Sequence, residues 1–186
     1  KALTGGAENI QSERKDILHA GDIEYRGFKN IKLGASVASN NPMIDNIATT
    51  NLATFRVAPR IWNFEFYGEY GIKQNNDTKE NVFAGSENNV GEAIYGSANF
   101  YLGKFSISGE YKYYDNFAFQ SHDKTITYNT PPSLRRDQTY ILLNRHPSAL
   151  DQNNETGFQI EGNYAFSSKT LLLLNYNQTS ILGSSS

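Results

Sequence analysis

The chain of 186 residues contains no cysteine and no apolar run long enough to cross a membrane as a helix. The absence of cysteine excludes a disulfide framework and any metal site with cysteine ligands. A membrane-spanning helix needs about 20 mostly apolar residues, whereas the leucine run from Leu171 to Leu174 is four residues long. The formal net charge of −2 provides no basic surface for nucleic acid, so no nucleic-acid partner is expected.

The sequence also has few residues that suggest a catalytic or cofactor site. Its three histidines, His19, His122 and His146, are scattered and lack the spacing of metal ligands. Pairs of carboxylates occur, as in glycoside hydrolases, but carboxylates repeated along a water-exposed strand arise without catalysis. We therefore expect no enzyme activity, no metal ion and no cofactor.

Aromatic and uncharged polar residues take the place of the missing groups. Hydrophobic residues make up 38% and charged residues 19% of the chain, alongside 12 Tyr, 11 Phe and 1 Trp. Disordered chains contain few aromatics, so disorder is not indicated. Transmembrane β-barrels have this balance, because half of every strand faces an aqueous lumen.

Strict alternation of apolar and polar residues is the main structural pattern, and it predicts β-strands with two different faces. Residues expected to face lipid or to form aromatic girdles are Trp62, Phe64, Phe66, Tyr70, Phe100, Phe105, Ile107, Tyr111, Tyr113, Phe158 and Tyr164. Phe28 and Tyr101 are expected in the same girdle as Trp62, and Tyr114 in the opposite one. Residues expected to face the lumen are Glu24, Arg56, Glu65, Glu69, Glu110, Lys112 and Glu161. The lumen charges are interpreted either as a solute-selective lining or as strand-to-strand pairs in a closed interior.

The alternation predicts an all-β fold, an antiparallel up-and-down transmembrane β-barrel with about eight strands in four hairpins. The expected strands are 20–28, 31–39, 51–60, 62–73, 91–102, 104–116, 156–166 and 171–180. Directly opposed residues of a hairpin share a face, and this rule sets the expected turns. Two-residue turns are expected at Gly103-Lys104, which places Phe100 opposite Ile107, and at Arg60-Ile61, which places Arg56 opposite Glu65. A three-residue turn is expected at 28–30, which places Tyr25 opposite Leu33. Another is expected at 168–170, which places Phe166 opposite Leu172 and Tyr164 opposite Leu174. Leu171 and Leu173 then point to the polar side, which the pattern does not explain.

Short turns alternate with long polar links over 40–50, 74–90 and 117–155. Outer-membrane barrels show this arrangement, with short periplasmic turns and long external loops. Within the third link, 139–144 is expected to form a short strand or helix. The same link is basic at Lys124, Arg135, Arg136 and Arg145, either to contact lipopolysaccharide or a partner, or simply as a solvated loop.

The expected organisation is an N-terminal extension or loop over 1–19, barrel strands and loops over 20–180, and a C-terminal tail over 181–186. If the short turns are periplasmic, both ends of the chain lie outside the cell, whereas bacterial barrels usually have periplasmic termini. We therefore expect the chain to be part of a larger barrel.

Several stretches resemble a known family. They are 52–73, 91–121, 139–166 and 169–180, with Tyr114-Asp115-Asn116, Gln138-Thr139-Tyr140, Leu142, Asn154-Glu155 and Gly157-Phe158-Gln159 as the carrying residues. The resemblance is to an uncharacterised family of large outer-membrane β-barrel proteins from Bacteroidota and related phyla, a domain family of unknown function. The sequence departs from it at 146–149. The resemblance implies a longer barrel and no catalytic residues.

Two hypotheses from different classes follow. The first is an integral outer-membrane barrel that acts as a passive pore or as a structural scaffold subunit of an envelope complex. Its partners would be membrane lipid, lipopolysaccharide and other envelope proteins. The alternative is a soluble extracellular β-sandwich that binds glycans through exposed aromatics. The glycines of the apolar face favour the barrel, because they would pack poorly in a sandwich core; they are Gly68, Gly96, Gly109 and Gly162.

Overall fold

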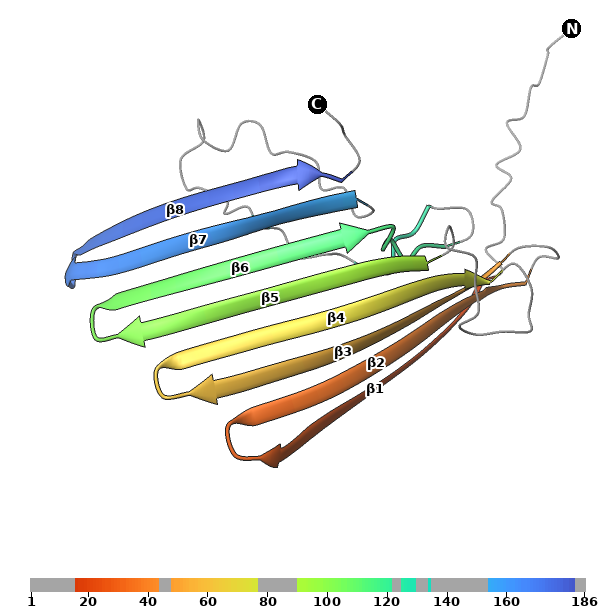
Figure 1. Cartoon of the computed structure of the whole chain (residues 1–186), viewed down its shortest axis with the longest axis horizontal. Helices are drawn as coiled ribbons and strands as arrows, with labels where there is room; N and C mark the ends of the chain where they lie inside the picture. Colours follow the sequence, from red (N-terminus) through yellow and green to blue (C-terminus); the bar gives the residue numbers. More distant parts are fainter. Residues whose placement is uncertain are drawn as a thin grey trace, which may run out of the picture.

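Eight long antiparallel strands form one sheet, in which each strand pairs with its neighbours in the sequence (Figure 1). The computed structural model describes residues 16–43, 48–76, 90–121, 125–129, 134 and 154–182. The strands are β1 (Asp16–Phe28), β2 (Ile31–Pro42), β3 (Thr49–Ile61), β4 (Phe64–Asn76), β5 (Val90–Leu102), β6 (Phe105–Asp115), β7 (Asn154–Ser167) and β8 (Thr170–Ile181). All eight expected strands are therefore present, although β1 begins at Asp16 rather than at residue 20 and β4 at Phe64 rather than at residue 62.

The sheet is a single open layer and does not close into a barrel. Its strand order runs from β1 to β8, so these two strands form its edges. The strands contain 11 to 14 residues each, enough to cross a bilayer at a tilt, for which about 9–11 residues suffice. No helix in the described ranges could span a membrane.

The four short turns lie together at one end of the sheet, and the longer links at the other (Figure 1). The turns occupy 29–30, 62–63, 103–104 and 168–169. Backbone hydrogen bonds join each hairpin to the next at this end, from Arg60 N to Asn30 O (2.7 Å), Tyr101 N to Asn63 O (3.0 Å) and Ala165 N to Lys104 O (2.9 Å). We call this end of the sheet the short-turn rim.

The register confirms two of the four expected hairpin alignments. Phe100 lies opposite Ile107 across a turn in which Gly103 has a φ of +59°, the left-handed conformation that glycine adopts without a steric cost. Tyr25 lies opposite Leu33 as expected, although the turn contains two residues rather than three, because the ladder is irregular between Tyr25 and Phe28.

The other two alignments were wrong. The β3–β4 turn is at 62–63 instead of 60–61, so Arg56 lies opposite Glu69 and not opposite Glu65. In the β7–β8 hairpin, Tyr164 lies opposite Leu172, because the turn is at 168–169 and the ladder shifts between Ala165 and Ser167. In both hairpins the observed pairing differs from the expected pairing by an even number of residues, outside the irregular part of β7–β8. The side chains therefore keep the faces that the alternation predicts.

The two faces of the sheet differ in polarity and in burial. One face, here called the apolar face, carries exposed side chains such as Phe55 (54% exposed), Ile160 (47%) and Leu174 (64%). The polar face holds most of the buried side chains, among them Asn40, Lys73 and Lys112. The ordinary arrangement of a water-soluble sheet, with apolar residues buried and polar residues exposed, is thus reversed.

Candidate functional site

The seven residues predicted to line a lumen all lie on the polar face, distributed over β1, β3, β4, β6 and β7. Arg56 and Glu69, two of the seven, lie opposite each other, and Lys112 lies opposite Tyr95. The eleven residues predicted to face lipid lie on or beside the apolar face. Register neighbours on that face include Phe64 with Phe100, and Tyr111 with Phe158.

Two residues of the predicted aromatic girdles lie on the polar face. Tyr101 lies opposite Ser106 on the polar face. Tyr114 lies opposite Glu155, also on the polar face, and is 4% exposed. Their neighbours Phe100 and Tyr113 occupy the apolar face, because successive side chains of a strand point in opposite directions.

A charged cluster on β1 to β3 is centred on Arg56. Its guanidinium binds the Asp22 carboxylate at 2.7 Å and 2.9 Å, from Nη1 and Nη2. Arg56 Nη1 also donates to Ser36 Oγ at 2.7 Å, and Ser36 Oγ donates to Asp22 Oδ2 at 2.6 Å. This bidentate arrangement ties the three strands together on the polar face.

Tyrosines and carboxylates alternate across the middle of the polar face. Tyr67 donates to Glu69 at 2.6 Å, and Tyr95 donates to Glu110 at 3.1 Å. The two tyrosine rings lie 5.9 Å apart. On the next strands Glu161 accepts hydrogen bonds from Asn163 (3.0 Å) and Asn175 (3.4 Å). These carboxylates are hydrogen-bonded both within a strand, as Tyr67 to Glu69, and between strands, as Tyr95 to Glu110.

The remaining predicted lumen residues also have partners. Lys112 forms an ion pair with Glu155, and their side chains are 1% and 8% exposed. Glu65 pairs with Arg60 at 3.1 Å, and Glu24 pairs with Arg26. Arg56 and Glu65 were expected to form an ion pair with each other, but Arg56 pairs with Asp22 and Glu65 pairs with Arg60. Glu65 meets Arg60 because the β3–β4 turn is at 62–63, which places these two residues opposite each other.

A segment of the third link folds over the polar face near the ends of β2 to β6. Its parts 117–121 and 125–129 face each other through an isolated bridge between Gln120 and Thr127. Phe117 is 7% exposed and stacks on Tyr114 with ring centroids 6.1 Å apart. A Cβ on Gly71 would lie 2.6 Å from Phe117 Cζ, so the ring covers the glycine closely. We call residues 116–121 and 125–129 the inward segment.

Polar side chains of the sheet anchor the inward segment. Lys73, 4% exposed, donates from Nζ to Asn116 Oδ1 (3.2 Å) and to the Ala118 carbonyl (3.1 Å). Asn40 donates from Nδ2 to the Gln120 carbonyl at 3.2 Å. The long-link end of the polar face is therefore covered by the protein itself.

Sequence reasoning missed several of these groups. Asp22 and Glu155 continue the polar alternation of β1 and β7, and that continuation could have identified them. Nothing in the sequence near Lys73 indicates that its ammonium binds a carbonyl 45 residues away.

Some expectations fall outside the part of the chain that the structure describes. They concern the possible short element at 139–144, the basic residues Lys124, Arg135, Arg136 and Arg145, and His122 and His146. Within the described residues, no group of three or more His, Asp or Glu side chains could hold a metal ion.

A comparison with known protein families shows to which family the chain belongs. Residues 2–185 match the family of unknown function DUF6029. The chain belongs to this family. Neither the curated proteins nor the solved structures contain a match to it.

Proposed function

We propose that this DUF6029 chain forms the wall of a β-barrel in a bacterial outer membrane, with its apolar face toward lipid and its polar face toward a lumen. The observation that carries the proposal is the reversed polarity of the sheet. Side chains such as Ile160 and Leu174 are exposed, whereas Lys112 and Glu155 are buried. A bilayer on one side and a hydrated interior on the other favour this arrangement.

The open edges support closure into a barrel. In the described part of the chain, the outer edges of β1 and β8 face no further strand. In lipid, each backbone N–H or C=O group of a sheet edge that lacks a hydrogen-bond partner costs roughly several kcal/mol. For this reason a sheet spans a membrane only when it is closed. We propose that β1 and β8 are joined either to each other or through further strands that complete a larger barrel.

The interior favours a scaffold over an open pore. Paired charges line the polar face, and the inward segment covers its long-link end through Phe117 and Lys73. We therefore propose a structural subunit of the envelope, with a lumen closed at that end. A two-layered sandwich is a poorer explanation, because all eight strands lie in one sheet.

The test of membrane integration is extraction of bacterial outer membranes with alkaline carbonate. We expect the protein to stay in the membrane pellet, together with a known integral barrel, whereas a peripheral protein should appear in the wash. Release of the chain with the peripheral control would overturn the proposal. Conductance in planar bilayers then separates the two roles: a scaffold closed at one end should pass little current.

A further inference from the structure

Basic residues recur at every hairpin of the short-turn rim. Three of the four turns contain a lysine, namely Lys29, Lys104 and Lys169. The fourth turn, at 62–63, is preceded by Arg60. Since the hairpins at this end are hydrogen-bonded to one another, the cations are spread along one edge of the sheet.

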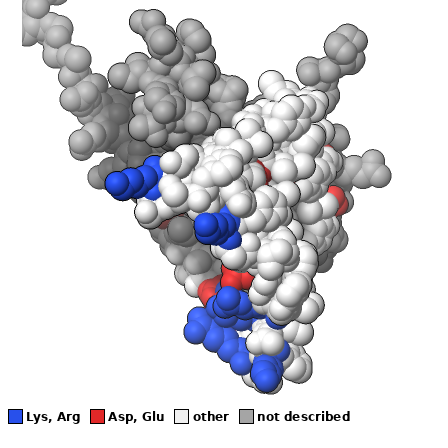
Figure 2. Space-filling model, turned by 90° about the vertical axis from the view of Figure 1, so that its left-hand side faces the viewer, with Lys and Arg blue, Asp and Glu red and all other residues white. Residues whose placement is uncertain are grey.

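The charge of the described residues is unequal between the two ends of the sheet. The short-turn rim carries six of the nine described basic residues and two of the ten acidic ones. The basic residues are Arg26, Lys29, Lys32, Arg60, Lys104 and Lys169. Figure 2 looks onto this end and shows the Lys and Arg side chains spread along it, with few acidic groups among them.

The two acidic residues of the rim are already engaged by arginines. Glu24 pairs with Arg26, and Glu65 pairs with Arg60 at 3.1 Å. Neither Lys29 nor Lys32 forms a salt bridge with a described residue. The short-turn rim therefore keeps an excess of positive charge among the described residues.

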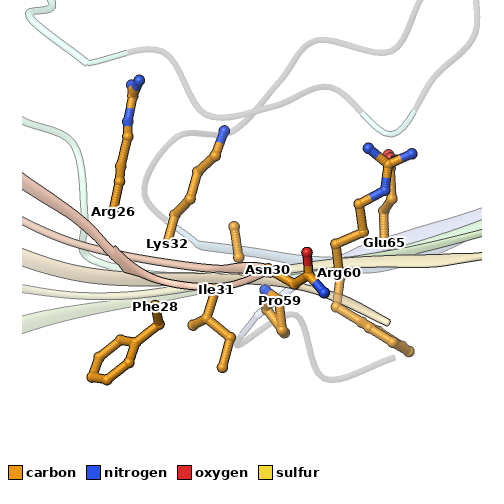
Figure 3. A pocket seen from close by; sticks show the side chains of 10 residues that line it. Arg26, Phe28, Asn30, Ile31, Lys32, Pro59, Arg60 and Glu65 are labelled. Atoms are coloured by element: carbon orange, nitrogen blue, oxygen red, sulfur yellow. The ribbon is translucent and has the colours of Figure 1, made fainter. Parts of the chain in front are cut away.

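Apolar side chains also gather at the short-turn rim. In the first hairpin, Arg26 and Lys32 extend from one side of the sheet, and Phe28 and Ile31 extend from the other (Figure 3). In the second, Trp62 is 73% exposed and contacts Phe64 and Phe100, with ring centroids 6.4 Å away from each. Aromatic rings next to cations are typical of the level of lipid headgroups.

From this pattern we infer that the short-turn rim binds the phosphate groups of anionic phospholipids in the adjacent leaflet. The inference rests on the proposed membrane insertion. A single small anion would require cations that converge on one point, whereas these cations are spread over four hairpins. An extended row beside a hydrophobic band matches a planar anionic surface, which attracts nearby Lys and Arg.

The one tryptophan of the chain makes this contact measurable. Trp62 lies on the rim, and its turn stands between the turns that carry Lys29 and Lys104. Bromine atoms on lipid acyl chains quench tryptophan fluorescence on contact. The full chain is reconstituted in phosphatidylcholine vesicles that contain phosphatidylglycerol, with either one or the other lipid brominated. Quenching of Trp62 then reports which lipid occupies the rim.

We expect phosphatidylglycerol to be enriched about fivefold over phosphatidylcholine near Trp62 at low salt, from the attraction of one lysine for an anionic surface. Replacing both neighbouring lysines, Lys29→Gln with Lys104→Gln, should abolish the enrichment. Lys29→Arg with Lys104→Arg should retain it. The matched control is Lys169→Gln, which neutralises a more distant turn and should leave the quenching of Trp62 unchanged.

The outcomes separate this inference from the proposed function. Equal quenching by the two brominated lipids would overturn the lipid preference and leave the barrel intact. Enrichment that survives Lys29→Gln with Lys104→Gln would also overturn it. An absence of quenching by either lipid, with release of the protein from vesicles in carbonate, would instead refute membrane insertion.

Discussion

The substitution Ile160→Arg places a positive charge at the middle of the apolar face. Ile160 is the seventh of the 14 residues of β7, so it lies about 20 Å along the strand from either end. The hydrophobic band of a transmembrane barrel is about 25 Å tall, so the proposed membrane insertion would place this position close to the centre of the bilayer. Its side chain is 47% exposed, so the sheet itself does not shield the charge.

The expected cost of Ile160→Arg depends on what surrounds the apolar face. In lipid, arginine at the bilayer midplane destabilises a barrel by about 2–4 kcal/mol. In water, a substitution at such an exposed position changes the free energy of unfolding by only about 0.5 kcal/mol. The difference exceeds the error of a denaturation experiment.

The matched control is Gln159→Arg, one residue away on the polar face. Gln159 lies opposite Glu110 and Asn177, so an arginine there meets a carboxylate and water. We expect a change of less than about 1 kcal/mol, within the range of strand-to-strand pairs. Urea unfolding of the vesicle-bound protein, followed by the fluorescence of Trp62, measures both variants. Equal effects of Ile160→Arg and Gln159→Arg would refute the assignment of the two faces.

Three further predictions concern the interior and the turns. Glu155→Gln should destabilise the protein by about 3–5 kcal/mol in the same assay, because it removes the carboxylate from the buried ion pair with Lys112, and adding Lys112→Met should recover most of the loss. Phe117→Ala should loosen the inward segment, with a cost of up to about 3–5 kcal/mol and an increase in bilayer conductance; an unchanged conductance would show that the lumen is closed elsewhere. Gly103→Ala should cost about 1–2 kcal/mol, because Gly103 has a positive φ that disfavours any side chain. An added Cβ would meet nothing within 4 Å, so the backbone conformation alone causes this cost. Lys104→Ala, the control, should be nearly neutral.

The strands and their faces could be predicted because the period of two persists over many residues. The segment 156–166 shows this most clearly, since every second residue from Phe158 onward lies on the apolar face. The pattern tolerates an alignment that is wrong by an even number of residues. For this reason the misplaced turns of the β3–β4 and β7–β8 hairpins did not disturb the assignment of the faces.

The turns themselves were harder to predict. The β5–β6 turn contains a glycine at its first position, and it was located correctly. The β3–β4 turn instead places Trp62 at a φ of +53°, a conformation that bulky residues rarely adopt. The ladder irregularities near Phe28 and Ser167 also lack a local sequence marker.

The cover of the polar face depends on contacts between distant parts of the chain. Phe117 lies over Gly71, and the Lys73 ammonium reaches the Ala118 carbonyl, 45 residues along the chain. Periodicity within a strand carries no information on such contacts. A glycine on the polar face can mark the close approach of another group, but Gly71 alone does not show which residue covers it.

Cysteine labelling along β7 tests the central claim most directly, because the chain has no native cysteine. Single cysteines would replace Phe158, Ile160 and Gly162 on one face, and Gln159, Glu161 and Asn163 on the other, in protein embedded in native outer membranes. A water-soluble maleimide should label the second set and leave the first set unreacted until the membrane is dissolved. Equal labelling of both sets would place both faces in water and contradict the account.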